Sequence, residues 1–471
     1  MAEGSGGRYD IVVLGGGSGG YACALRAAEL GKRVALIEKD KVGGTCLHRG
    51  CIPTKAMLHA AEIADQARES AKFGIKSTFE GIEMPGVLRY QASVVDRLWK
   101  GLQSTIASRK IDTVIGDGRL ASPTSVRVNG TVYEADHVVL ATGSEPRSLP
   151  GLDIDGTRVI TSDDALRLDR VPGSVVVLGG GVIGVEFASV WRSFGADVMI
   201  VELLPQLLPL EDESSAKTLQ RMFRRRGISF ELNAMFESVK PSDVGVTVAL
   251  EGGKTLEAEL LLVAVGRGPV SSGLGYEENG VALNRGYVIV DELCRTGVPT
   301  ISAVGDLVAL QDRGHPQLAH VGFAEGILVA ERVSGLDIHP IDYDGVPRIT
   351  YSDPEVASVG LTSAQIAERE LEVVEVNYPL GANGRSVILQ TQGAAKVIAE
   401  AGSDGSGPGR VLGVHLVGSR VGELIAEGQL IYNWDAEPSD VAKLIHPHPT
   451  QSEIIGEAHL ALAGKPLHFH A

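Results

Sequence analysis

Two stretches of the chain share one pattern of apolar and polar positions. Residues 10–40 read DIVVLGGGSGGYACALRAAELGKRVALIEKD, and residues 174–204 read SVVVLGGGVIGVEFASVWRSFGADVMIVELL. A constant shift of 164 positions, 174 against 10, aligns the two without a gap. Each begins with a short apolar run that ends in glycines, continues with a helical pattern, and closes with a second apolar run. We therefore predict that each stretch forms a strand, a glycine turn, a helix and a second strand.

A second repeat follows each copy. Residues 134–144 (EADHVVLATGS) match residues 257–267 (EAELLLVAVGR), and both read as buried strands that enter a glycine turn. A hairpin signal precedes each of them, at residues 129–130 (Asn-Gly) and 252–253 (Gly-Gly). The chain is thus predicted to hold two similar α/β domains.

The rest of the chain has a different pattern. TISAVGDLV (300–308) reads as a strand followed by a Gly-Asp turn, and from about residue 349 two alternating strands flank a Gly/Ser loop at 402–409, followed by helical segments. This predicts an antiparallel sheet with helices, a further domain of α+β type. The predicted domains are 1–150, 151–270, 271–348 and 349–471.

Composition narrows the class of protein. The chain has 471 residues and a formal net charge of −16, which argues against nucleic acid or an anionic membrane as partner. No apolar stretch is long enough to span a membrane, and we read residues 1–10 as a short disordered tail. Four cysteines in a chain of this length do not form a secreted disulfide framework, so we expect a cytoplasmic protein.

Three glycines follow the first strand of each copy in the order G-x-G-x-x-G. The first permits a tight turn, the second lets the backbone approach a pyrophosphate, and the third lets the helix pack closely on the strand. The helix N-terminus offers amide donors to the phosphates, and the acid that ends the second strand suits a ribose hydroxyl. These features predict two dinucleotides, a flavin and a nicotinamide. The residues are Gly15, Gly17, Gly20 and Glu38 in the first copy, and Gly179, Gly181, Gly184 and Glu202 in the second.

The residues after Glu202 indicate which nicotinamide is used. They read LLPQLLPLEDE and include no Arg or Lys that could meet a 2′-phosphate, which the carboxylate would also repel. We therefore expect NAD and not NADP.

Cys46 and Cys51 lie close together in GGTCLHRGCIPTK. A zinc site would need a second pair, but Cys23 and Cys294 stand alone, so no metal is predicted. On one regular helix the two Cα atoms would lie roughly 8.7 Å apart, whereas a disulfide needs less than about 7 Å. A disulfide thus requires a distorted helix, which Gly50 suits. The spacing alone leaves a redox pair and two buried thiols as alternatives.

The C-terminal motif HPHPTQSEIIGE also allows two interpretations. Thr450 and Glu453 match the capping box at the start of a helix. Alternatively, His448 acts as an acid–base and Glu453 orients it. Both can hold at once, because a cap would fix the direction of His448; His446 is expected to be a structural or solvent-facing neighbour.

Four motifs together resemble those of the flavoprotein pyridine-nucleotide disulfide oxidoreductases. They are GGTCLHRGCIPTK, GGGVIGVEFA, SAVGDL and HPHPTQSE, in the order found in the family. The resemblance covers nearly the whole chain. It implies a glutathione-reductase-like fold, in which an FAD domain is interrupted by an NAD domain, a central segment completes the FAD site, and an interface domain forms a homodimer.

The resemblance also implies roles for single residues. Cys51 would be the charge-transfer thiolate beside the flavin, and Cys46 would exchange with the substrate. His448 and Glu453 of one chain would complete the active site of the other. Lys55 would lie by the flavin and pair with Glu186. Further FAD contacts would be Thr45, Ala141, Thr142, Gly143 and Asp306, and Gly266 would lie near NAD.

Within the family the likeness is greatest to the members that oxidise dihydrolipoamide. The implied reaction forms lipoamide and reduces NAD⁺ to NADH through FAD and a Cys46–Cys51 disulfide. Lipoyl domains of 2-oxo acid dehydrogenase complexes would be the partners. The alternative function is an NAD(P)H-dependent reductase of small disulfides, of the glutathione or mycothione type, and a flavin-bound sensor is the non-enzymatic one.

The loop between the cysteines departs from the commonest family sequence. That sequence is C-L-N-V-G-C, whereas this chain has C-L-H-R-G-C. His48 and Arg49 either face solvent or add positive charge near the sulfurs. We hypothesise that Arg49 favours the thiolates of the reduced pair.

Overall fold

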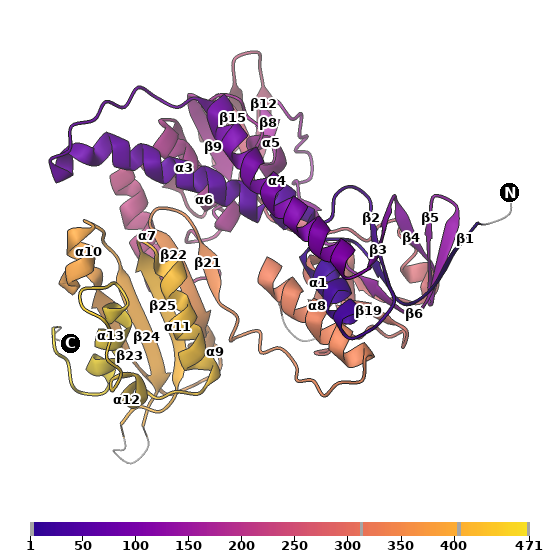
Figure 1. The fold of residues 1–471 in the computed structure, drawn as a ribbon. Helices are drawn as coiled ribbons and strands as arrows, with labels where there is room; N and C mark the ends of the chain where they lie inside the picture. Colours follow the sequence, from indigo (N-terminus) through magenta and orange to yellow (C-terminus); the bar gives the residue numbers. More distant parts are fainter. Residues whose placement is uncertain (1–3, 311–313, 403–406, 469–471) are drawn as a thin grey trace. The chain divides into compact units, whose positions relative to one another are not determined.

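The computed structural model describes residues 4–310, 314–402 and 407–468 (Figure 1). The chain divides into two compact units, each assembled from segments that are far apart in the sequence. The first unit combines Met1–Met57, Pro85–Arg147 and Gly266–Tyr343, and the second combines Leu58–Met84, Ser148–Val265 and Asp344–Ala471.

A seven-stranded sheet forms the core of the first unit. Its order is β3-β2-β1-β6-β5-β4, and β19 pairs with the last three residues of β6. The strands β1, β2, β3, β6 and β19 pair in parallel, while β4 and β5 form an antiparallel hairpin extension. Parallel strands that are covered on both faces have apolar residues at successive positions. This explains the continuous apolar runs VVL in β1 and VALI in β2. The strands are β1 (Gly4–Leu14), β2 (Val34–Glu38), β3 (Asp112–Ile115), β4 (Gly118–Ser122), β5 (Ser125–Val128), β6 (Thr131–Leu140) and β19 (Ile301–Ala303).

Helices and two small sheets complete this unit. The helices α1 and α8 pack side by side (Figure 1). The strand β7 pairs with β16, and β17, β18 and β20 form a third sheet. The elements are α1 (Ser18–Glu29), α2 (Gly44–Arg49), α4 (Met84–Ser108), α8 (Ala319–Val333), β7 (Ser144–Pro146), β16 (Arg267–Pro269), β17 (Leu283–Asn284), β18 (Tyr287–Val290), β20 (Val308–Leu310), η2 (Glu277–Asn279) and η3 (Gly305–Leu307).

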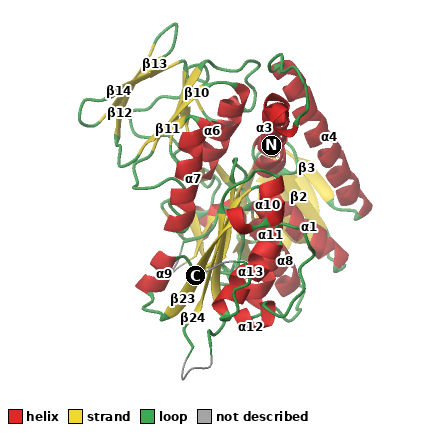
Figure 2. Ribbon diagram, turned by 90° about the vertical axis from the view of Figure 1, so that its left-hand side faces the viewer, coloured by secondary structure: helices red, strands yellow, loops and turns green. Residues whose placement is uncertain are grey.

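The second unit contains the second copy of the repeat. A parallel sheet runs β11-β10-β9-β15-β8, and an antiparallel sheet β12-β13-β14 accompanies it (Figure 2). The helix α3 (Cys51–Glu69) begins in the first unit and ends in this one. The other elements are η1 (Ser70–Phe73), β8 (Val159–Ile160), α5 (Ser162–Ala165), β9 (Ser174–Leu178), α6 (Val182–Phe194), β10 (Asp197–Val201), α7 (Glu213–Arg226), β11 (Ile228–Glu231), β12 (Phe236–Pro241), β13 (Val246–Leu250), β14 (Thr255–Ala258) and β15 (Leu260–Val263).

The C-terminal part of the second unit is an antiparallel sheet with helices. Its strand order is β21-β22-β25-β24-β23, with α11 against β22 and β25 and α13 against β23 and β24. The elements are β21 (Arg348–Thr350), β22 (Glu355–Gly360), α9 (Ser363–Glu368), β23 (Val373–Pro379), η4 (Leu380–Ala382), α10 (Gly384–Ile388), β24 (Ala394–Glu400), β25 (Val411–Gly418), α11 (Val421–Asn433), α12 (Pro438–Val441) and α13 (Glu453–Leu462).

The predicted fold class is confirmed, and two local predictions can be compared with the structure. Both hairpin signals form turns, with positive φ at Asn129, Gly130, Gly252 and Gly253. The prediction of a disordered tail is wrong from Gly4 onward, because β1 begins at Gly4. The backbone there pairs with Thr131 and Val132 at the start of β6. Residues 1–3 lie outside the described chain, as do 403–406 of the predicted Gly/Ser loop. In the described ranges no helix is long and apolar enough to cross a membrane.

Candidate active site

The first glycine turn joins β1 to α1 and is shaped as the motif predicts. Gly15 has a φ of +108°, and a side chain there would overlap the carbonyl of Ala141. A side chain at Gly20 would overlap the carbonyl of Gly15, so helix and strand pack at glycine distance. A Cβ at Gly17 would meet nothing within 4 Å. The backbone at Gly17 is thus open to a phosphate, whereas Gly15 and Gly20 are packed against backbone carbonyls.

The second turn, between β9 and α6, has the same geometry. Gly179 has a φ of +109° and lies against the carbonyl of Ala264, and Gly184 lies against the carbonyl of Gly179. A Cβ at Gly181 would again meet nothing within 4 Å. The two turns therefore fit a pyrophosphate in the same way, one in each unit.

The acids at the ends of β2 and β10 close these turns. Glu38 Oε2 accepts the amide of Gly16 at 2.8 Å, and Glu202 Oε2 accepts that of Gly180 at 2.6 Å. The second oxygen of Glu202 accepts the amide of Leu204 at 2.8 Å. Carboxylate oxygens can accept further hydrogen bonds, so both acids remain suited to a ribose hydroxyl.

A polar chain fixes the Gly-Asp turn at η3, and it includes two residues that the sequence analysis missed. Asp306 Oδ2 accepts from Ser144 Oγ at 2.6 Å, and Arg267 Nε donates to that hydroxyl at 2.8 Å. Ser144 and Arg267 end the two repeated segments 134–144 and 257–267, and β7 pairs with β16 there. Their matched places in the repeat were the available signal.

Ala141, Thr142, Gly143 and Gly266, which are also predicted to contact FAD or NAD, follow the ends of β6 and β15, whereas Thr45 lies in α2. Thr142 Oγ1 donates to the carbonyl of Val270 at 2.5 Å and contacts the hydroxyl of Tyr276 at 3.0 Å. Gly143 and Gly266 have φ values of +69° and +103°, so both are glycines that turn the chain after a buried strand. Their roles in cofactor binding stay predictions.

The two cysteines flank a break between helices. The helix α2 ends at Arg49, Gly50 has the non-helical angles φ −146° and ψ −109°, and α3 begins at Cys51. The predicted helix distortion at Gly50 is thus confirmed. Both cysteines are half-buried thiols, and the break lets Cys46 form a hydrogen bond with Cys51.

Neighbouring groups change the pKa of the Cys46 thiol and of a nearby tyrosine. The hydrogen bond to Cys51 and then burial raise the pKa of Cys46 far above its ordinary value, and Lys55 opposes this. Tyr21, in α1, is a further neighbour that the sequence analysis missed: burial first, and then the two cysteines, raise its pKa to about 12. Lys55 follows Cys51 by one turn of α3, which places its charge near the sulfurs.

In the loop between the cysteines, His48 is not fully exposed to solvent. His48 is half-buried, its Nε2 lies 3.0 Å from the carbonyl of Val42, and its ring meets the edge of Trp99. Lys55 lowers the pKa of Cys46. The effect of Arg49 on the thiolates stays a prediction.

His448 and Glu453 meet in the second unit. Glu453 Oε1 bonds His448 Nδ1 at 2.9 Å, and Oε2 accepts the amide of Thr450 at 2.8 Å. Burial raises the pKa of Glu453, but the bonds from Thr450 and His448 outweigh it and hold the pKa below its ordinary value. The His448 side chain is 77% exposed.

The predicted capping box is only partly right. Glu453 does accept the Thr450 amide, but α13 begins at Glu453, and Thr450 Oγ1 donates to the carbonyl of Pro447. His446, the expected structural neighbour, is half-buried with Nε2 2.7 Å from Glu427. The motif therefore orients His448 without capping the helix through Thr450.

Glu186 lies on one face of α6 with Ser189 and Ser193, and all three are buried. Glu186 Oε1 accepts the amide of Tyr351 at 3.0 Å, and Ser189 Oγ accepts that of Asp353 at 3.0 Å. These bonds fasten the segment before β22 along the helix that carries Glu186.

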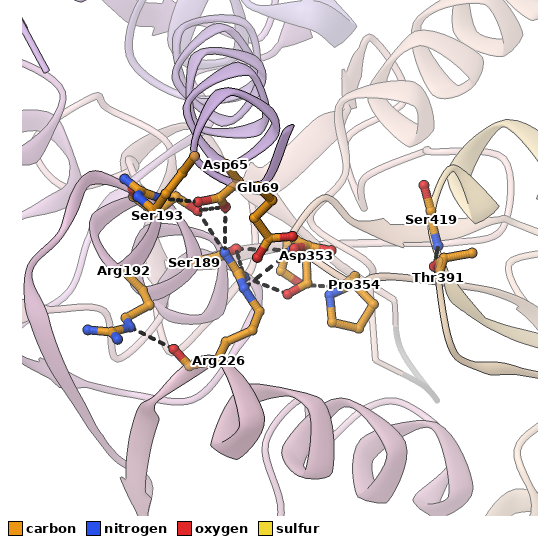
Figure 3. Close-up of polar contacts among 12 residues, drawn as sticks. Asp65, Glu69, Ser189, Arg192, Ser193, Arg226, Asp353, Pro354, Thr391 and Ser419 are labelled. Carbon is orange, nitrogen blue, oxygen red and sulfur yellow. Dashed lines mark hydrogen bonds and ion pairs between the residues drawn. The ribbon is translucent and has the colours of Figure 1, made fainter. Parts of the chain in front are cut away.

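Arg226, at the end of α7, joins this face of α6 to α3. Figure 3 shows its guanidinium among Asp65, Ser193 and Asp353. It donates to Ser193 Oγ at 2.7 Å, to the carbonyl of Asp353 at 2.6 Å, and to Asp65 Oδ2 at 3.1 Å. One cation thus anchors Glu186's helix to the helix that begins at Cys51.

The predicted site residues form two groups. One unit brings together Cys46, Cys51 and Lys55, together with the first glycine turn. The other holds Glu186, the second glycine turn, and the His448–Glu453 pair. Among the described residues no cluster of His, Cys, Asp and Glu could hold a metal ion.

The glycine turns, the cysteine pair and the fold define a flavin- and nicotinamide-dependent disulfide oxidoreductase. Residues 9–326 match the family model "Pyridine nucleotide-disulphide oxidoreductase", and residues 346–459 match the dimerisation domain of that family. The chain belongs to this family. The predicted family is confirmed, as is the prediction of an oxidoreductase enzyme that uses FAD and NAD.

Full-length relatives narrow the class further. Dihydrolipoyl dehydrogenase of Bacillus subtilis is 40% identical, covering 98% of this chain and 99% of that protein, and the mitochondrial dihydrolipoyl dehydrogenase of Pisum sativum is 37% identical, covering 98% and 92%. Among solved structures, LpdA from Mycobacterium tuberculosis has a TM-score of 0.87 at 28% identity, covering 97% and 99%. The flavoprotein disulfide reductase RclA from Escherichia coli has a TM-score of 0.85 at 29% identity, covering 96% and 99%.

Proposed function

We propose that this chain oxidises dihydrolipoamide to lipoamide with NAD⁺ as the electron acceptor. The carrying observation is the Cys46–Cys51 contact across the helix break at Gly50, in a chain that holds two dinucleotide turns. The similarity to dihydrolipoyl dehydrogenases over the whole chain supports the substrate. FAD, when bound, supplies the two-electron carrier between the cysteine pair and NAD⁺.

The first chemical task falls to His448. A substrate thiol with a pKa near about 8.5 is mostly protonated at neutral pH and needs a base. Glu453 holds Nδ1 of His448 and stays ionised, which leaves Nε2 to take the proton. The substrate thiolate then attacks Cys46 in the oxidised pair, and the bond between Cys46 and Cys51 breaks.

The second task is to place charge on the correct sulfur. His448 releases the first proton to solvent and then takes the proton of the substrate's second thiol. That thiolate attacks the substrate sulfur bonded to Cys46, so the disulfide of lipoamide forms, and Cys46 leaves and takes the proton from His448. The hydrogen bond to Cys51 raises the pKa of Cys46, so the proton stays on Cys46 and the negative charge on Cys51. Lys55, one helical turn after Cys51, adds positive charge near the two sulfurs.

The cofactors are assigned to the two glycine turns. The residues proposed for FAD are Gly15, Gly17, Gly20, Glu38, Thr45, Lys55, Ala141, Thr142, Gly143 and Asp306. Those proposed for NAD are Gly179, Gly181, Gly184, Glu202 and Gly266, and Glu186 is proposed as the partner of Lys55. The domain limits 1–150, 151–270, 271–348 and 349–471 remain part of this proposal.

The proposed assembly is a homodimer with shared active sites. The family's dimerisation domain covers residues 346–459, which include His448 and Glu453. An exposed base in one chain suits a site that another chain completes. Lipoyl domains of 2-oxo acid dehydrogenase complexes are the proposed partners, and the cytoplasm the proposed location.

A two-cofactor, two-substrate assay tests the proposal. We expect NADH from dihydrolipoamide and NAD⁺, and much slower oxidation of NADPH by glutathione or mycothione disulfide. An enzyme that forms no NADH from dihydrolipoamide would contradict the proposal. Rapid NADPH-dependent reduction of small disulfides would support the alternative reductase.

A further inference from the structure

A buried carboxylate holds the Gly-Asp turn of the first unit. Glu325, in α8, has no exposed surface, and its Oε2 accepts the amide of Gly305 at 2.6 Å. Gly305 has a φ of +76° and directly precedes Asp306. The direction in which Asp306 is presented therefore depends on where the Glu325 carboxylate lies.

Two side chains that do not belong to α8 form hydrogen bonds with the other oxygen of this carboxylate. His315 Nε2 and Tyr343 Oη each lie 2.7 Å from Glu325 Oε1. The His315 side chain is 3% exposed, and its ring meets the edge of the Tyr343 ring. Within the described ranges, the buried Nδ1 of His315 has no hydrogen-bond partner, so the bond to Glu325 is what orients the ring.

We propose that His315 and Tyr343 are positioning residues of the FAD site, acting through Glu325 on the turn that presents Asp306. This inference rests on the assignment of Asp306 to FAD in the proposed function. The carboxylate has donors on both oxygens: the amide of Gly305 on one, and His315 with Tyr343 on the other. Removing a donor from one oxygen frees the carboxylate to rotate away from the other.

The chemistry of the carboxylate also explains why an amide should hold the turn less firmly. A glutamine at 325 offers one oxygen and one NH₂ group, and an NH₂ cannot accept a hydrogen bond. The amide would therefore face either the donor of Gly305 or the donors of His315 and Tyr343. With its oxygen toward Gly305, the NH₂ group can donate to His315 Nε2 and to the Tyr343 hydroxyl only after both switch from donating to accepting, and these bonds no longer involve a charged carboxylate.

The test compares FAD affinity with the stability of the protein without FAD, in the full-length chain. The variants are Tyr343→Phe, His315→Asn and Glu325→Gln, and the control is His137→Ala. His137 is another buried histidine of this unit, bonded to Ser302 Oγ at 2.9 Å. FAD is removed and titrated back, and the visible circular dichroism of the bound flavin is recorded with the unfolding midpoint of the FAD-free chain.

Loss of one hydrogen bond to a charged group predicts roughly 10-fold weaker FAD binding for Tyr343→Phe, and a larger loss for Glu325→Gln. The visible circular dichroism of the flavin should change in Tyr343→Phe and in Glu325→Gln. His137→Ala should instead lower the unfolding midpoint and leave the FAD affinity unchanged. If Tyr343→Phe folds and binds FAD as tightly as the unaltered chain, the inference is wrong. If the unaltered chain itself does not rebind FAD, the proposed function fails instead.

Discussion

Single residues in the proposed site do two tasks at once, and Glu453 is the clearest case. One carboxylate oxygen orients His448 and the other holds the backbone at Thr450. An ionised carboxylate also stabilises the imidazolium that forms when the histidine takes a proton. The same two-sided use of a carboxylate recurs at Glu325 and at Glu202.

Replacing Glu453 by Gln should lower kcat/KM for dihydrolipoamide by about 100-fold, because the base loses its charged partner. The pH profile of kcat/KM should also change, because the variant lacks the ionised carboxylate that bonds Nδ1 of His448. Steady-state kinetics between pH 6 and 9 would measure both. Glu427→Gln is the matched control, because it alters the neighbouring His446 pair and should leave the profile in place. Equal kinetics in E453Q and the unaltered enzyme would exclude the role of Glu453.

At the scale of elements, the break between α2 and α3 determines whether the cysteines can pair. Gly50 separates the two helices, and a Cβ there would lie 3.1 Å from the carbonyl of Thr45. A side chain at this position favours a continuous helix, and a regular helix holds the two Cα atoms roughly 8.7 Å apart.

Gly50→Ala should therefore weaken disulfide formation between Cys46 and Cys51. In the oxidised enzyme, titration with a thiol reagent should detect two more thiols in this variant than in the unaltered chain. Gly101→Ala is the control: it lies within α4, a Cβ there meets nothing within 4 Å, and it should stabilise the chain by about 0.5–1 kcal/mol. An unchanged thiol count in G50A would show that the pair tolerates a regular helix.

The sequence predicted the elements better than it predicted the contacts between them. The glycine turns, the hairpins and the break at Gly50 depend on local conformation, which neighbouring residues determine. The contacts of Asp306 with Ser144, and of Gly305 with Glu325, join residues that no short pattern relates. The start of α13 was misplaced because Thr450 bonds Pro447 instead of a helix amide.

At the scale of the whole molecule, one carboxylate should make stability depend on pH. Burial raises the pKa of Glu355 from 4.5 to about 7, against the bond it accepts from the amide of Gly422. Between pH 4.5 and about pH 7, the folded chain therefore binds more protons at Glu355 than the unfolded chain does. Stability should therefore fall as the pH rises from about 4.5 through about 7.

Glu355→Gln should remove this loss, because an amide oxygen can accept the Gly422 bond without a charge. Denaturation in urea should show the variant more stable by up to about 3 kcal/mol at pH 8 and similar to the unaltered chain near pH 4. Glu372→Gln, an exposed carboxylate of the same sheet region, should change neither value. A variant that is equally stabilised at both pH values would mean that charge at Glu355 is not the cause.

Sharing of active sites between two chains can be tested by mixing inactive variants. Cys46→Ser lacks the exchanging sulfur, and His448→Ala lacks the base, so each homodimer should be inactive. If His448 serves the cysteines of the other chain, a mixed dimer has one site with both defects and one site with neither. Random assembly makes about half of the dimers mixed, so co-refolded chains should regain roughly a quarter of the unaltered activity. A mixture of C46S with itself controls for refolding. If both residues instead acted within one chain, every site in every dimer would carry one defect, and the mixture would stay inactive.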